Sequence, residues 1–334
     1  MAAMVTQKDI AKKLGVSVTL ISRVLAGKAH EIGAATATVD SIQKTATEMG
    51  YVPNATARVL KGAPSRTLGV VVYDFEDPFL GAITGALQHL AHASDYTLVL
   101  VGFEQRRADA QALRPLSKHG MSGMIVVGSG SNDEWLDIFR GRRMRVARIG
   151  SGPTANQSTV AIDNADGMEQ IINHLAFRKY QSAGFIGDIH PAHQERLRHF
   201  TTQTAHHNIT TRQEWQIIRT DPAAMSGYKA AQMLIASHRQ ALPRALVAAS
   251  DAIAMGALRA FQEHGISVPG KIALTGFDGI PFADMITPAL TTVKQPVQAM
   301  AQTAFEWVTG ELQAPTPKAP VVLLKGELLV REST

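Results

Sequence analysis

The sequence predicts an α/β protein: a small all-helical N-terminal domain followed by a larger part made of parallel sheets flanked by helices. Three observations predict this fold. Apolar residues recur at helical spacing over the first fifty residues. From Thr67 onward, short β-branched runs alternate with helical stretches. The two parts also differ in charge. A length of 334 residues suits two or three domains.

Residues 7–25 have the spacing of a helix-turn-helix. Ala11 is small enough for the crossing of two short helices, Gly15 can take the positive φ of a turn, and Ser17 can cap the second helix. The outer face of that helix could meet base edges and phosphates in a major groove, although a plain two-helix packing motif is the alternative. The candidate DNA contacts are Ser17, Val18, Thr19, Ser22 and Arg23.

A third helix fits residues 39–49, and a short helix-capable run follows at 54–60. Isolated helices under ~12–15 residues are marginal in water, so this run should order only against a partner. Leu60 on a basic linker suits an apolar side chain that is inserted into a minor groove. A disordered linker is the alternative, and we expect it of the free protein.

Charge is concentrated at the N-terminus. Residues 1–66 hold nine Lys and Arg against four Asp and Glu, whereas the other 268 residues hold 24 of each sign. This asymmetry favours a polyanion-binding module joined to a neutral body, with a solvated basic face as the alternative. The absence of Cys excludes disulfide scaffolds and thiolate metal sites. Without a signal peptide or an apolar run near ~18 residues, we expect a cytoplasmic protein without membrane contact.

Eight buried runs are predicted as strands, and residues 79–93 as a helix between the first two. So many strands exceed one ordinary sheet, so we expect two α/β domains with a ligand crevice at the carboxyl ends of the strands. In the C-terminal part, the helical spacing of Met300, Ala304 and Trp307 indicates core or subunit interface. The expected strands are 68–74, 96–102, 121–130, 145–150, 182–188, 215–221, 245–250 and 271–278.

The candidate ligand residues follow the ends of these strands, and His193 is among them, after the strand at 182–188. Carboxylates and Arg guanidinium groups make paired, directional hydrogen bonds to sugar or nucleoside hydroxyls, and an aromatic face can stack on a ring. Asp251 is expected to cap a helix rather than to bind ligand, and Asp163 to cap or hinge another. The effector-binding candidates are Tyr73, Asp77, Phe79, Ser129, His190, Arg196, Pro222, Ser250 and Asp278, with Pro222 as lining only.

Two motifs, V-S-x-x-x-I-S-R-V-L at 16–25 and G-Y-x-P-N-A-x-A-R-x-L at 50–60, resemble the lactose-repressor (LacI/GalR) family of bacterial transcription regulators, and the resemblance covers nearly the whole chain. It implies a ligand-responsive regulator, usually a repressor, that binds a pseudo-palindromic operator as a homodimer. It also implies a periplasmic-binding-protein-like effector domain. By this resemblance, bases are read by Val18, Thr19 and Arg23, and the hinge helix contains Asn54, Ala57 and Leu60.

The resemblance extends to D-P-F at 77–79, R-L-x-x-F at 196–200 and G-F-D at 276–278. It implies a small polar effector: a sugar, a sugar acid or a nucleoside-like molecule. Asp77 and Ser250 stand where the family commonly has Asn, so no common pentose or hexose is assigned. The third helix lacks the family's usual Ser cap, since Ala35 is at that position and Thr36 or Thr38 would have to substitute.

A solute-binding protein of a sugar transport system is the alternative function, but the basic N-terminus argues against it. No G-x-S-x-G, P-loop or metal constellation occurs, so we expect no enzyme, cofactor or metal site. His190 and His193 have metal-compatible spacing, but Pro191 opposes it; the Arg cluster at 140–148 is expected to be a solvated loop. The expected domains are 1–51 (helix-turn-helix), 52–66 (hinge), 67–163 with 295–325 (N-lobe) and 164–294 with 326–334 (C-lobe).

Overall fold

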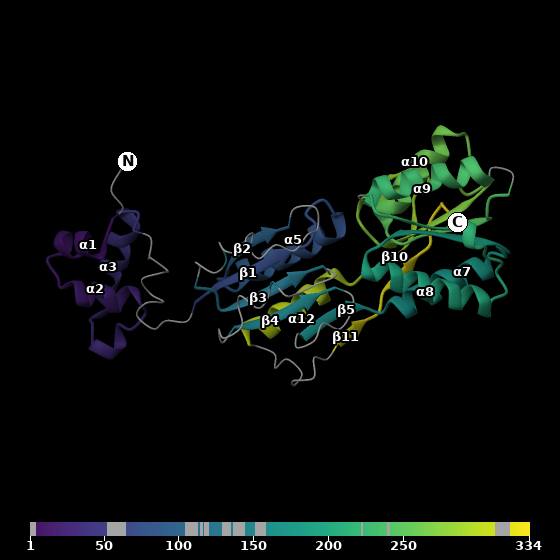
Figure 1. The fold of residues 1–334 in the computed structure, drawn as a ribbon. Helices are drawn as coiled ribbons and strands as arrows, with labels where there is room; N and C mark the ends of the chain where they lie inside the picture. The colour runs from purple at the N-terminus through teal and green to yellow at the C-terminus, as the bar shows by residue number, and fades with distance from the viewer. Residues whose placement is uncertain are drawn as a thin grey trace. The chain divides into compact units, whose positions relative to one another are not determined.

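A computed structural model gives the fold of the chain in two compact units, Met1–Pro64 and Ser65–Thr334 (Figure 1). The described residues are 5–51, 65–103, 113, 116, 120–128, 135, 144–150, 158–221, 223–238, 241–310 and 321–334. None of the helices within these residues has both the length and the apolar character needed to cross a membrane.

The first unit is a helix-turn-helix with a third helix packed on it. Ala11 and Ile21 are buried where α1 and α2 meet, and Gly15 takes the left-handed conformation of the turn at φ 67°. Ser17 caps α2 by accepting the N–H of Leu20, as its position in the sequence predicts. Ile42 of α3 completes the buried core. The elements are α1 (Gln7–Leu14), α2 (Val18–Leu25), the 3₁₀ turn η1 (His30–Ile32) and α3 (Thr36–Glu48).

The start of α3 differs from the prediction. The helix begins at Thr36, three residues before the predicted position, and ends at Glu48. Ala35 occupies the N-cap, and no side chain caps the helix, so neither Thr36 nor Thr38 replaces a capping Ser. The Ala35 carbonyl accepts the N–H groups of Thr38 and Val39 and so starts the helix before its apolar pattern begins. A helix start without a capping oxygen forgoes about 0.5–2 kcal/mol, which burial of Ile42 must offset.

The first sheet of the second unit has the order β11-β5-β4-β3-β1-β2, and its neighbouring strands are parallel. Helices α5 (Pro78–Ala93) and α12 (Val297–Thr309) pack on each other, and α12 also packs on the sheet. Met300, Ala304 and Trp307 of α12 are buried in this core. The strands are β1 (Thr67–Val72), β2 (Thr97–Gly102), β3 (Gly123–Val127), β4 (Arg145–Ile149), β5 (Ser158–Ile162) and β11 (Val321–Leu324).

The second sheet has the order β12-β10-β9-β8-β6-β7 and carries α7 (Asn164–Phe177), α8 (Pro191–His206), α9 (Ala223–His238) and α10 (Asp251–Glu263). Phe185, Phe261 and Phe277 are fully buried in its core. The remaining elements are β6 (Ala183–Asp188), η4 (Gln213–Trp215), β7 (Gln216–Arg219), β8 (Ala245–Ala248), β9 (Ala273–Asp278), α11 (Phe282–Met285), β10 (Thr291–Lys294) and β12 (Glu327–Leu329).

One strand departs from the predicted parallel arrangement. Strand β12 pairs with β10 in the antiparallel sense. The chain leaves the first sheet at the carboxyl end of β11 and enters β12 after only two residues. Because the carboxyl ends of both sheets face the same cavity, a strand entered directly from that side must run against its neighbours. The chain crosses between the sheets at two other places, from β5 to α7 and from β10 to α12.

Candidate nucleic-acid interface and ligand cavity

The outer face of α2 presents polar and small apolar side chains to solvent. Val18 is 40% exposed, and Thr19 and Arg23 are also exposed, whereas Ile21 and Val24 on the opposite face are buried. Ser17 is exposed at the N-cap and Ser22 is half-buried. The structure thus brings the five candidate residues of α2 to one end and face of a short helix that is anchored through its other side.

Arg23 has a partner that the sequence did not predict. Its Nη1 lies 3.0 Å from a carboxylate oxygen of Glu31, which η1 presents from the long connection between α2 and α3. Lys28 also approaches Glu31, at 3.4 Å. All three side chains are substantially exposed, so the ion pairs add little to stability. The Glu31 carboxylate restricts the orientation of the Arg23 guanidinium and lowers the net positive charge of this face.

Several predicted positions lie outside the described residues. These are the hinge candidates Asn54, Ala57 and Leu60 and the cavity candidates Ser129 and Pro222.

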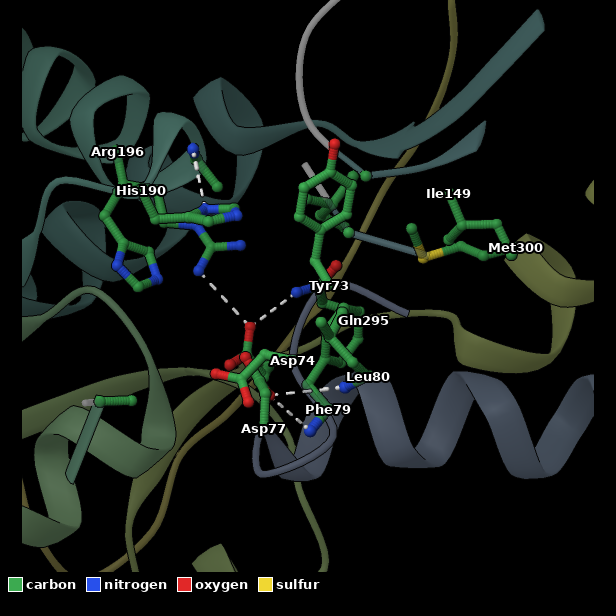
Figure 2. A pocket seen from close by; sticks show the side chains of 17 residues that line it. Tyr73, Asp74, Asp77, Phe79, Leu80, Ile149, His190, Arg196, Gln295 and Met300 are labelled. Atoms are coloured by element: carbon green, nitrogen blue, oxygen red, sulfur yellow. Dashed lines mark hydrogen bonds and ion pairs between the residues drawn. The ribbon is translucent and has the colours of Figure 1, made fainter. Parts of the chain in front are cut away.

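A cavity lies between the two sheets of the second unit, where the carboxyl ends of their strands meet (Figure 2). Six predicted residues line it together: Tyr73, Asp77, Phe79, His190, Arg196 and Asp278. His193, which the sequence places among the residues after the strand ends, also lines it. The lining residues that the sequence did not single out as ligand contacts are Asp74, Leu80, Gly128, Ile149, Gly150, Ile162, Ala192, Ala223, Gln295 and Met300.

Arg196 is the most constrained group of the cavity. Its Nε donates to Asn164 Oδ1 at 2.8 Å, and its Nη1 donates to the Ala249 carbonyl at 2.6 Å and lies 3.4 Å from Asp278 Oδ1. The guanidinium also stacks over the Phe277 ring, 3.7 Å from its centroid. Burial lowers the pKa of Arg196, an effect that the Asp278 charge opposes. The side chain is 3% exposed and is therefore held ready for a ligand without rearrangement.

The carboxylate of Asp278 is hydrogen-bonded to the segment in which the chain crosses from β10 to α12. Oδ1 accepts Nε2 of Gln295 at 2.7 Å, and Gln295 follows β10 at the crossing to α12. Burial raises the pKa of Asp278 well above its usual range, and the positive charge of Arg196 acts in the opposite direction. Its φ of 123° is a backbone conformation that costs a non-glycine residue energy. Asp278 is therefore fixed by its surroundings, in a place where its carboxylate can accept from ligand hydroxyls.

Asp77 and Tyr73 form the first-sheet side of the cavity. Asp77 caps α5 by accepting the N–H groups of Phe79 at 2.8 Å and Leu80 at 3.4 Å, and burial raises its pKa. Tyr73 is 3% exposed, and its hydroxyl accepts Nε1 of Trp135 at 3.2 Å. In Figure 2, Tyr73, Ile149 and Met300 lie across the cavity from His190 and Arg196.

Ser250 and Asp251 have roles that differ from those the sequence suggested. Ser250, predicted to bind effector, is buried, caps α10 by accepting the N–H of Ile253, and is not among the residues that line the cavity. Asp251, predicted to cap this helix, instead accepts from the Ile280 N–H at 2.8 Å and the Thr292 hydroxyl at 2.5 Å. Burial raises the pKa of Asp251 to about 6. The cap predicted at Asp163 is confirmed, since its side chain accepts the N–H of Asp166.

The Arg-rich segment is not simply a solvated loop. Arg145 and Arg148 belong to β4, and Arg148 is fully buried, with Nη1 donating to the Gly128 carbonyl at 2.8 Å. It lies over the ring of Tyr73, behind the cavity wall. The apolar residues of R-V-A-R-I gave a strand signal, but the sequence carried no signal that the second Arg faces the core. Within the described part of the chain, no three His, Asp or Glu side chains converge as metal ligands.

Comparison with known proteins matches both units. Residues 6–54 match the model described as bacterial regulatory proteins, lacI family, and residues 172–334 match the periplasmic binding protein-like domain. The HTH-type transcriptional repressor PurR of Pectobacterium atrosepticum is 30% identical over 336 residues, which cover 99% of this chain and 97% of that protein. The chain belongs to the LacI family of bacterial regulatory proteins.

Other members of the LacI family agree with this assignment. The HTH-type transcriptional regulator GalS of Salmonella typhimurium is 30% identical over 91% of this chain and 88% of its own length. The crystal structure of a lac repressor dimer bound to operator and the anti-inducer ONPF has a TM-score of 0.85 at 23% identity, covers 99% of each chain and shows the same fold. This LacI-family chain is thus a DNA-binding transcriptional repressor with a two-lobed effector domain, and its relatives are regulators rather than enzymes.

Proposed function

We propose that the protein binds a pseudo-palindromic operator as a homodimer. The observation that carries this proposal is the face of α2, on which Val18, Thr19 and Arg23 are exposed while its reverse side is packed into the core. A helix of this kind reads base edges from its N-terminal residues, and two copies read two half-sites. The curated repressor at 30% identity and the operator-bound lac repressor dimer support the proposal.

We further propose that a small polar effector binds in the cavity between the sheets and changes operator affinity. The effector class is a sugar, a sugar acid or a nucleoside-like molecule. The cavity supports this class because it combines carboxylates, a guanidinium and aromatic rings at strand ends. Regulation requires that the effector bind the two states of the protein with different affinity. The effector contacts we propose are Tyr73, Asp77, Phe79, Ser129, His190, Arg196, Pro222 and Asp278.

The proposed boundaries of the two lobes follow the crossings between the sheets, at 163/164, 294/295 and 325/326. Residues 52–66 are proposed as the hinge, with Asn54, Ala57 and Leu60 contacting the minor groove. The proposed location is the cytoplasm, on the nucleoid when DNA is bound. The two-lobed body would equally suit a solute-binding transport protein, and DNA binding separates the two functions.

Selection of duplexes from a random pool by the full-length protein tests the proposal. We expect enrichment of a sequence with two-fold symmetry, bound with an affinity whose log–log salt slope is roughly −0.9 per phosphate contacted. A thermal-shift screen of sugars, sugar acids and nucleosides then identifies compounds that alter this binding. A protein that enriches no duplex at low salt, yet is stabilised by one of these compounds, would be a solute-binding protein instead.

A further inference from the structure

The wall of the cavity formed by α8 differs in chemistry from the wall opposite. His190, His193 and Arg196 line the cavity from the N-terminal part of this 16-residue helix. Their groups offer hydrogen-bond donors and positive charge, whereas the first-sheet side contributes Asp74, Asp77 and aromatic rings. No acidic residue occurs in the first turn of α8 itself, and the carboxylate at its start is Asp188 of β6, which accepts the N–H of His190.

His193 is the side chain that turns this wall into a binding site. It is only 9% exposed, and its Nδ1 lies 2.5 Å from Asp188 Oδ1. Among the residues that the structure describes, no hydrogen-bond partner is found for Nε2, the nitrogen left to the cavity. His193 lines the cavity, so this nitrogen is available to a polar group of a bound ligand.

Asp188 orients the imidazole of His193 through the contact with Nδ1. Burial works against its ionisation, but the hydrogen bond and charge of His193 and the N–H of His190 outweigh burial and hold the pKa of Asp188 well below its usual range. Asp188 is thus ionised, and its hydrogen bond with Nδ1 holds the imidazole of His193 in a fixed orientation. Asp188 is a positioning residue, since it acts through the imidazole.

His190 presents a second donor beside the first. Its Nδ1 accepts the N–H of Ala192 at 3.3 Å, which leaves the proton of the neutral ring on Nε2. The rings of His190 and His193 lie 5.3 Å apart, close enough for both to reach the two oxygens of one carboxylate. Arg196 adds a fixed positive charge one turn further along α8.

The carboxylates of the cavity do not occupy this position. The negative charge of Asp278 faces Arg196 and Gln295, and Asp77 accepts from the N-terminus of α5. Asp74 accepts the N–H of Glu76. These oxygens are acceptors, and acceptors suit ligand hydroxyl groups. A molecule with an acidic group at one end and several hydroxyls elsewhere therefore complements both walls.

We propose that the effector is a polyhydroxy carboxylic acid of the sugar-acid class, whose carboxylate binds His190 and His193 while its hydroxyls face Asp77 and Asp278. This inference rests on the proposed effector cavity and narrows its ligand class. His193, oriented by Asp188, is then the residue that distinguishes an acid from its neutral parent sugar.

Isothermal titration of the full-length protein tests this with D-gluconate, D-glucuronate and D-galacturonate against glucose and galactose. We expect at least one acid to bind at least tenfold more tightly than either neutral sugar. His193→Gln, which removes the imidazole but keeps a polar side chain, should weaken that acid about ten- to hundredfold and weaken neutral sugars far less. His206→Gln is the control, since it makes the same replacement at an exposed position on the same helix.

The outcomes separate this inference from the function on which it rests. Binding of a neutral sugar as tight as that of the acids, binding of none of the three acids, or an unchanged acid affinity in His193→Gln overturns the inference. The comparison of acids with neutral sugars in the wild-type protein stands even if His193→Gln does not fold. Duplex binding by the same wild-type sample is measured separately, and only its loss counts against the regulator itself.

Discussion

At the scale of single residues, Glu31 places a negative charge beside the Arg that is proposed to read the operator. Its ion pair with Arg23 restricts the guanidinium, and its charge repels nearby phosphates. We predict that Glu31→Gln tightens binding to random duplex about two- to fivefold and reduces the preference for the selected operator, because a less restrained Arg23 discriminates less. Filter binding or anisotropy against both duplexes measures the two effects.

Two further variants serve as controls for this prediction. Glu48→Gln changes the net charge equally at an exposed position at the end of α3, and it should leave operator preference unchanged. Arg23→Ala should weaken operator binding by ~1–3 kcal/mol. If Glu31→Gln and Glu48→Gln behave identically, the contact with Arg23 has no role in selectivity.

The sequence located the cavity residues that directly follow recognisable strands, such as Tyr73 after β1 and Arg196 after β6. It did not locate Gln295 and Met300, because the strand before them, β10, has only four residues and no long apolar run. His193 was among the candidates that follow the strand ends, but the sequence did not predict its partner. Its pairing with Asp188 depends on how α8 leaves the sheet, and no spacing rule conveys that direction.

At the scale of elements, the close approach of α9 and α10 depends on two glycines. A Cβ on Gly227 would meet the backbone carbonyl of Ile253, and one on Gly256 would meet the carbonyl of Ala224. Because backbone cannot move aside cheaply, we predict that Gly227→Ala destabilises the effector domain by about 1–3 kcal/mol or more. Chemical denaturation followed by circular dichroism measures the change.

The control for this prediction is Gly85→Ala in α5. Gly85 is exposed within a helix, and an added Cβ would enter open space. This replacement should stabilise the domain by about 0.5–1 kcal/mol, because alanine is the better helix former. Equal effects at Gly85 and Gly227 would show that helix propensity, and not the crossing of α9 and α10, determines the result.

The strands that the sequence predicted are those with long β-branched or buried runs, including β1, β3 and β6. The missed strands β5, β10, β11 and β12 have three to five residues, and all four lie next to crossings between the sheets. Such strands form because a neighbouring edge is available to pair with them, which is a property of tertiary structure. The same reason explains why the antiparallel β12 was not predicted.

At the scale of the whole molecule, the two units divide charge and binding between them. The excess of basic residues lies within residues 1–66, whereas the ligand cavity and both large cores lie within Ser65–Thr334. We therefore predict that a fragment of residues 65–334 folds cooperatively, binds the ligands of the full chain within about twofold of its affinity, and does not bind duplex DNA. Calorimetry and anisotropy on the fragment check both statements.

The two sheets of the second unit cannot be separated in the same way, because chain segments cross between them. A fragment of residues 65–163 holds β1 to β5 but lacks α12, which packs on that sheet, and β11, which pairs with β5. It would expose apolar surface that α12 covers through Phe305 and Trp307. We expect this shorter fragment to show no cooperative unfolding transition, in contrast to residues 65–334. If it unfolded cooperatively, the first sheet would be an independent folding unit, and ligand-dependent changes between the lobes would need no contribution from the crossing segments.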